Sequence, residues 1–162
     1  MQKYVIVFFI TLDTVQKEFS CLEWPLHITL LANFTISSPV NKLINNLEGL
    51  SKQTKPLRVR VEGEDKFGPN RDVHVSLINP NVEIKALHDK LVNLTKELGA
   101  QYDEPKYMSK GFRPHATIKF DSQLYEGQIV TIDSFTLVDM YPDNDINRRR
   151  LMQTFSLEAD KG

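Results

Sequence analysis

The sequence predicts an α+β fold formed by a single domain over residues 1–162. Short apolar runs and alternating patterns typical of strands recur along the chain, and two segments carry apolar residues at helical spacing. A chain of this length buries about 70% of the surface that its unfolded form exposes, so it needs neither a disulfide nor a metal to fold. Hydrophobic residues make up 41% and charged residues 25%, which excludes a disordered chain, a collagen and a disulfide-framework toxin.

The first predicted strand is the uncharged run at residues 4–12. Its β-branched and aromatic residues favour a strand buried on both faces. The run could pass for the apolar part of a signal peptide, but no cleavage site of small residues follows it. It is also far shorter than the roughly 20 residues of a membrane-spanning helix, so we expect a soluble, cytoplasmic protein. Residues 13–21 are predicted to form a short helix, and residues 26–34 a second strand.

Two longer helices are predicted in the middle of the chain. Ser38 and Pro39 fit the N-cap and first position of one helix. Its apolar stripe is Val40, Leu43, Ile44, Leu47 and Leu50. The other helix spans residues 82–98 and ends at Gly99. Its stripe is Ile84, Leu87, Leu91, Leu94 and Leu98.

In the remaining predicted strands, apolar and polar residues alternate or several apolar residues follow one another. They are residues 57–61, residues 73–78 after the turn Gly68-Pro69-Asn70, residues 114–120, residues 128–140 and residues 151–157. A loop of mixed charge at residues 103–112 precedes the third of these, and residues 141–144 join the last two.

The charge balance argues against a general affinity for nucleic acid. Twenty Lys and Arg face 21 Asp and Glu, for a net charge of −1, so any phosphate site must be a local cluster. Arg148, Arg149 and Arg150 could form such a patch, but alternation would split them over two faces, which favours a solvated hairpin end. The single cysteine, Cys21, cannot form an internal disulfide, which indicates a reducing compartment, and we expect it to be buried.

Three of the four histidines begin the same pattern, His-x-Ser/Thr-aliphatic. The copies are His27-Ile28-Thr29-Leu30, His74-Val75-Ser76-Leu77 and His115-Ala116-Thr117-Ile118. About 0.2 copies are expected by chance at this composition. Residues two apart on a strand share a face, so His27 projects with Thr29, and His115 with Thr117 and Lys119. The opposite faces would meet the core through Ile28, Leu30, Ala32 and Phe34 in one strand and Ala116, Ile118 and Phe120 in the other.

Two such strands brought together would present two imidazoles and two hydroxyls to one ligand. One neutral imidazole can accept a proton and a protonated one can donate it, while the hydroxyls donate hydrogen bonds to phosphate oxygens. These are the groups that transesterification of a phosphodiester or hydrolysis of a cyclic phosphate requires.

The segments Pro25–Leu30 and Arg113–Ile118 together resemble the two HxTx signatures of the two-histidine phosphoesterase superfamily, the LigT-like 2′-5′ RNA ligase and cyclic phosphodiesterase group. The 88 residues between His27 and His115 also resemble that family. The resemblance implies two pseudo-symmetric halves of antiparallel sheet and helices around a central groove. It implies hydrolysis of 2′,3′-cyclic phosphates or 2′-5′ linkages without a metal or other cofactor. It assigns His27 and His115 as the acid–base pair, with the roles open, and Thr29 and Thr117 as phosphate binders.

Residues next to the second motif are candidates for substrate binding. Arg113 and Lys119 could contact phosphate, and either Tyr107 or Phe112 could stack on a base. Packing in the core or at the rim is an alternative for both aromatic residues and for Trp24.

His74 and His88 are not assigned to catalysis. We expect His74 to be structural or to line the groove, and His88 to lie at the surface.

Two other functions stay open at this point. The same chemistry suits a phosphodiesterase for cyclic oligonucleotide or 2′-5′ oligoadenylate signals, and the fold could instead be a nucleotide-binding module without turnover. The expected partner is a nucleotide or short RNA with a cyclic phosphate or 2′-5′ linkage, with no membrane partner, and the expected state is a monomer.

Overall fold

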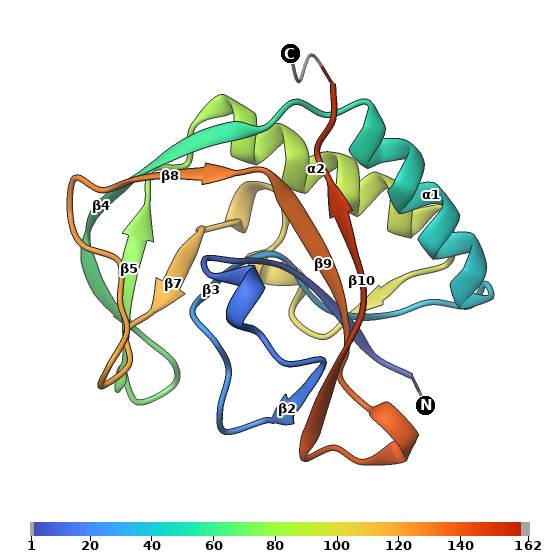
Figure 1. Cartoon of the computed structure of the whole chain (residues 1–162), viewed down its shortest axis with the longest axis horizontal. Coiled ribbons are helices and arrows are strands. Elements are labelled where there is room, and N and C mark those ends of the chain that lie inside the picture. Colours follow the sequence, from blue (N-terminus) through green and yellow to red (C-terminus); the bar gives the residue numbers. More distant parts are fainter. Residues whose placement is uncertain (1, 160–162) are drawn as a thin grey trace.

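A computed structural model describes residues 2–159 and contains two antiparallel sheets and two helices (Figure 1). The larger sheet has the order β2-β10-β9-β1-β3-β6 and the smaller β7-β5-β4-β8. The helices are α1 (Val40–Lys52) and α2 (Val82–Lys96). The strands are β1 (Tyr4–Phe9), β2 (Glu18–Ser20), β3 (His27–Thr35), β4 (Leu57–Phe67), β5 (Val73–Ile78), β6 (Gln101–Tyr102), β7 (His115–Thr117), β8 (Ile129–Ile132), β9 (Ser134–Asp139) and β10 (Arg148–Ser156). This architecture confirms the predicted α+β class, and it is consistent with two pseudo-symmetric halves.

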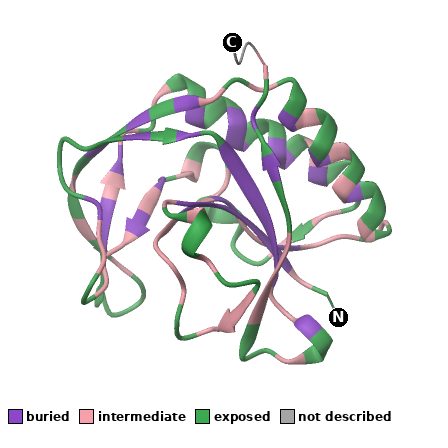
Figure 2. Ribbon diagram, in the orientation of Figure 1, coloured by how far each residue is buried: buried purple, intermediate pink, exposed green. Residues whose placement is uncertain are grey.

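Strand β1 lies at the centre of the larger sheet and is buried on both faces, as its composition predicts. Alternate residues enter two separate apolar clusters: Tyr4, Ile6 and Phe8 join the main core, whereas Val5 and Phe9 join a smaller cluster on the other face. Figure 2 shows this burial along the inner strands and the inward sides of the helices. The second cluster matters for function because it lies on the face that carries His27.

The helices lie together on one side of the molecule (Figure 1). Helix α1 begins one residue later than predicted, with Pro39 as its N-cap and no side-chain cap from Ser38. Helix α2 begins after Asn81, whose side chain accepts a hydrogen bond from the Ile84 amide at 2.9 Å. Among residues 2–159, none of the helices has the length and apolarity needed to cross a bilayer.

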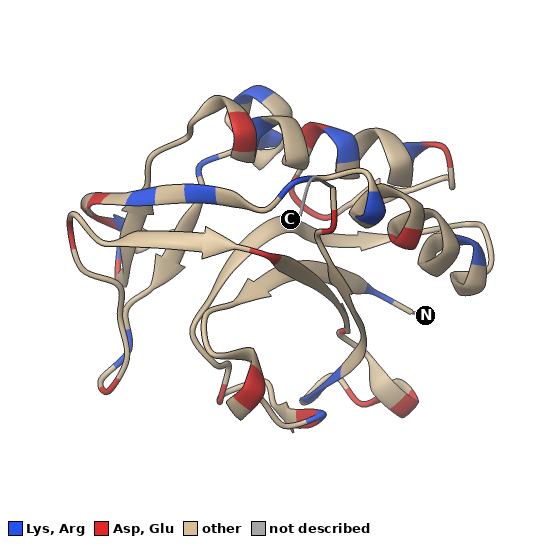
Figure 3. Ribbon diagram, turned by 45° about the horizontal axis from the view of Figure 1, so that its top comes forward, with Lys and Arg blue, Asp and Glu red and all other residues tan. Residues whose placement is uncertain are grey.

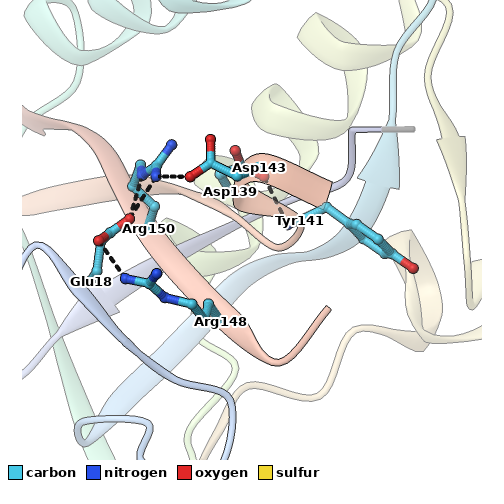
Figure 4. Close-up of polar contacts among 6 residues, drawn as sticks. All are labelled: Glu18, Asp139, Tyr141, Asp143, Arg148 and Arg150. Carbon is cyan, nitrogen blue, oxygen red and sulfur yellow. Dashed lines mark hydrogen bonds and ion pairs between the residues drawn. The ribbon is translucent and has the colours of Figure 1, made fainter. Parts of the chain in front are cut away.

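The predicted helix at residues 13–21 is wrong. A three-residue 3₁₀ turn, Leu12–Thr14, leads instead into β2, which pairs with β10. Glu18 fixes this pairing through Arg148 at 2.6 Å and Arg150 at 2.7 Å (Figure 4). Pairing with a strand more than 100 residues away overrides the local helical pattern. Cys21 at its end is partly exposed, not buried as expected.

The three consecutive arginines are split as predicted. Arg148 and Arg150 face Glu18, and Arg150 also pairs with Asp143 at 2.7 Å, whereas Arg149 donates to the carbonyls of Met140 and Ile146. Acidic partners on neighbouring segments neutralise this hairpin end (Figure 4). Over the rest of the molecule, Figure 3 shows basic and acidic residues interspersed.

Strands β3 and β4 each contain a β-bulge, which changes the face to which the following side chains point. Val7 pairs with Thr29 and Ile6 with Leu31, so β3 has one extra residue there. The bulge places Leu31 in the core and leaves the expected core residue Ala32 only half-buried. In β4, the register shifts between Val61 and Glu64 around Gly63, whose φ is +83°.

The second motif strand is shorter than predicted. Strand β7 ends at Thr117, and the chain then turns between Lys119 and Ser122. Phe120 is therefore fully exposed, contrary to the expected core position. The predicted strand at residues 128–140 is two strands, β8 in the smaller sheet and β9 in the larger, so the chain crosses between sheets at Asp133.

Candidate active site

The fold places the first and last histidine motifs next to each other. Strand β7 is an edge strand of the smaller sheet, and it contacts β3 of the larger sheet. The positive charge of His115 is the smallest of the causes that lower the pKa of His27, in agreement with this contact between strands. The remaining copy of the histidine pattern, which begins at His74, does not face the other two. His74 precedes Val75, which pairs with Thr117, so alternation directs His74 to the face opposite Thr117, and it is exposed.

Both motif histidines are held by the same local hydrogen bond. The Nδ1–H of His27 donates to the carbonyl of Pro25 at 2.7 Å, and that of His115 donates to the carbonyl of Arg113 at 2.8 Å. In the neutral ring this bond places the proton on Nδ1 and leaves Nε2 as the acceptor. No protein group of residues 2–159 hydrogen-bonds to either Nε2, so each motif presents this nitrogen as an acceptor.

Aromatic rings support each imidazole from the side. His27 lies 4.7 Å from Trp24 and 6.1 Å from Phe9, measured between ring centroids. His115 meets the edge of Phe67 at 4.6 Å. Phe67 reaches this face because the bulge at Gly63 reverses the alternation of β4. The packing restricts both rings and removes water from them.

Thr29 and Thr117 lie two residues beyond each histidine and are half-buried. Thr29 pairs with Val7 and Thr117 with Val75, so each hydroxyl projects on the same face as its histidine. Within residues 2–159, neither hydroxyl hydrogen-bonds to another protein group. Both are available to donate to a ligand oxygen.

Two cations flank the histidines. Lys119 donates from Nζ to the carbonyl of Trp24, so its ammonium extends from the second motif to the first. Arg113 lies 4.9 Å over the Phe67 ring and pairs with Asp65 at 3.0 Å. Its guanidinium is more than half exposed, so further donors remain for an anion.

The electrostatics differ between the two histidines. Burial lowers the pKa of His27 to about 4, and the charges of Lys119 and His115 act in the same direction, against the hydrogen bond to Pro25. Burial also lowers the pKa of His115, assisted by the Arg113 charge and opposed by the bond to the Arg113 carbonyl. The shift at His27 is large, so burial biases this imidazole strongly toward its neutral form.

The two aromatic candidates occupy different environments. Tyr107 is 51% exposed, with the Lys106 ammonium 5.0 Å from its ring centroid. Phe112 stacks in parallel on His88, with centroids 3.9 Å apart and an interplanar angle of 1°. One face of Phe112 is thus already covered by protein.

The surface position predicted for His88 is wrong, because the residue is only 2% exposed. The ring lies on the inward face of α2, and both of its nitrogens have backbone partners. Sequence reasoning also missed Phe67 and Asp65. Continuing the alternation of β4 past Val61 would have placed both residues on the core face, and the reversal at Gly63 has no signal beyond the glycine itself.

Two hollows in the described structure are lined by residues outside the two motifs. Their volumes are about 220 and 360 Å³, and they are lined by residues 32–33 with 103–104, and by residues around Tyr4 and Ile36. In the described part of the chain, no group of three or more His, Cys, Asp or Glu side chains could hold a metal ion.

Comparison with known proteins identifies the family of this chain. The model of the 2′-5′ RNA ligase superfamily matches residues 17–131, a range that includes both motifs. A Bacillus licheniformis protein named “Putative phosphoesterase” is 30% identical over 95 residues, which is 58% of this chain and 52% of that protein. The alignment thus spans about half the length of this curated relative.

Solved structures share the fold at low sequence identity. A Thermus thermophilus protein superposes with a TM-score of 0.64 at 18% identity, covering 99% of this chain and 100% of that one. Escherichia coli LigT complexed with 3′-AMP gives a TM-score of 0.59 at 14% identity, covering 96% and 98%. The match over nearly the full length of both proteins shows a LigT-like fold.

Proposed function

The chain belongs to the 2′-5′ RNA ligase superfamily, and from this premise we propose that it is a phosphodiesterase that hydrolyses 2′,3′-cyclic phosphates or 2′-5′ linkages of RNA ends and short oligonucleotides, without a metal. The main support is the repeated arrangement of His27 and His115, in which identical Nδ1 hydrogen bonds leave both Nε2 atoms free on adjoining strands. A binding module would have no need of such a pair.

For a cyclic phosphate, the reaction is addition of water across one P–O bond. The neutral imidazole takes a proton from water as its oxygen bonds to phosphorus, and the protonated imidazole gives a proton to the departing ribose oxygen as that P–O bond breaks. Thr29 and Thr117 donate to the non-bridging oxygens, whose charge increases in the transition state. Each turnover leaves the two protonation states exchanged, and solvent restores them.

The different environments support a role for each histidine. The strongly lowered pKa of His27 favours its neutral form, the form a general base needs. His115 then holds the proton that the leaving oxygen receives. A phosphate between the two would also interact with Lys119, which is already directed to the first motif.

Nucleotides are the proposed ligand class. Solved complexes of E. coli LigT hold 3′-AMP and ATP, which supports a nucleotide-sized ligand in this fold. Arg113 is proposed to contact phosphate, and Tyr107 or Phe112 to stack on a base.

The test is a panel of nucleoside 2′,3′-cyclic phosphates, 2′-5′ dinucleotides and 2′-5′ oligoadenylates, with the phosphate position of each product identified. His27→Ala and His115→Ala should each lose roughly 10²–10⁴-fold in kcat. His74→Ala is the matched control, because it removes an exposed histidine of the same pattern on the opposite face. EDTA should leave the rate unchanged. Full activity in both motif variants would refute the proposal, and tight nucleotide binding without product would favour the non-catalytic alternative.

A further inference from the structure

The buried imidazole of His88 joins the two halves of the candidate site. Its Nδ1–H donates to the Leu30 carbonyl at 2.7 Å, and its Nε2 accepts the Ser109 amide at 3.0 Å. One partner is a carbonyl and the other an N–H, so only the neutral ring with its proton on Nδ1 satisfies both. Both nitrogens of a buried imidazole need partners, and here two segments far apart in the sequence supply them.

Both partners belong to segments that carry the motifs. Leu30 is the residue after Thr29 and lies at the bulge where β3 has one residue more than β1. Ser109 lies in the loop that leads to the second motif, and its φ of +54° is uncommon for a residue other than glycine. Helix α2 therefore holds the end of one motif and the approach to the other through a single ring.

The stack on Phe112 extends this connection to His115. Phe112 is parallel to the His88 ring at 3.9 Å and directly precedes Arg113. The carbonyl of Arg113 accepts the Nδ1–H of His115 at 2.8 Å. A continuous set of contacts thus runs from Leu30 through His88 and Phe112 to His115.

We propose that His88 is a positioning residue that sets the separation between the two motif histidines, an inference that rests on the proposed phosphodiesterase activity. Its ring does not contact the substrate. It holds β3 and the loop at residues 105–112 at a fixed distance, so that both Nε2 atoms reach one phosphate.

The experiment compares three variants on a cyclic phosphate that the wild-type protein hydrolyses. His88→Phe keeps the ring stack but leaves the Leu30 carbonyl and the Ser109 amide unpaired. His88→Gln supplies an amide with one acceptor and one donor group. Thr95→Val is the control, because Thr95 is fully buried on the same helix and hydrogen-bonds to Leu91, Val92 and Tyr102, away from both motifs.

We expect His88→Phe to lose at least tenfold in kcat with KM changed less than about threefold, because small misplacements of reacting groups strongly reduce rate. His88→Gln should recover part of this loss, and Thr95→Val should keep the wild-type kcat. Circular dichroism shows whether His88→Phe folds. If it does not, a loss of at least threefold in the kcat of His88→Gln supports the proposal. Equal kcat in the folded His88 variants and in Thr95→Val would overturn the inference.

A second measurement separates this inference from the proposed activity. If the wild-type protein hydrolyses nothing in the panel, the proposed function fails, and binding of inorganic phosphate decides the role of His88. The ring-proton signals of His27 and His115 are followed during a phosphate titration. At least tenfold weaker binding in His88→Phe (or, if that variant does not fold, at least threefold in His88→Gln), with unchanged binding in Thr95→Val, would support the positioning role. Equal binding, or no phosphate binding by the wild-type protein, would overturn it.

Discussion

Acid should destabilise this protein through His27 in a window that its burial defines. Its pKa is about 4 in the folded state and 6.5 without the fold. The unfolded chain therefore binds more protons between these values, and the free energy of unfolding falls as the pH drops from 6.5 to 4. The full difference corresponds to roughly 3 kcal/mol, of which about 2 kcal/mol is lost by pH 5.

Urea unfolding at pH 7.5 and pH 5.0 measures this contribution. The wild-type protein should lose about 2 kcal/mol more between the two pH values than His27→Gln, which has no titrating group at this position. If wild type and His27→Gln lose the same free energy, or if the His27 ring titrates near 6.5 by NMR, the reasoning from burial is refuted.

Three further predictions concern the groups around the histidines. Thr29→Val and Thr117→Val should each lower kcat by roughly 10- to 100-fold with far-ultraviolet circular dichroism unchanged, because each removes one donor to the developing charge; unchanged kcat would remove the hydroxyls from the site. Lys119→Met should raise the pKa of His27, since the ammonium is one of its three depressing causes, and an NMR titration that does not move upward contradicts this. Gly63→Ala should destabilise the fold by about 1 kcal/mol in urea unfolding and reduce kcat by misplacing Phe67, because φ at Gly63 is +83°. The control Gly49→Ala on the exposed face of α1, with nothing within 4 Å of the added Cβ, should instead be neutral or stabilising, and equal destabilisation would exclude a role for the positive φ.

Local patterns in the sequence predict the elements whose own residues carry the pattern of burial. The run at residues 4–12 predicts β1 because both of its faces are apolar, and the stripe from Ile84 to Leu98 predicts α2 because its period matches the helix. The HxTx spacing places each histidine beside its threonine by strand alternation alone. These features need no knowledge of distant contacts.

The errors fall where a distant segment decides. Strand β2 forms because β10 supplies both its hydrogen bonds and the two arginines that pair with Glu18. His88 is buried because Leu30 and Ser109 satisfy its two nitrogens, which its helical position cannot reveal. Phe67 faces His115 only because one extra residue in β4 reverses the alternation. Pairings and bulges of this kind are long-range properties.

The carbonyl that holds each imidazole belongs to the tripeptide ending in that histidine, so the ring is oriented by its own immediate neighbours. A unit this small is self-contained and could be supported by many different surroundings. The rest of the chain then has to hold β3 and β7 at the correct separation, and cores of different composition can do this. The solved structures with this fold superpose along nearly their whole length although fewer than one residue in five is the same.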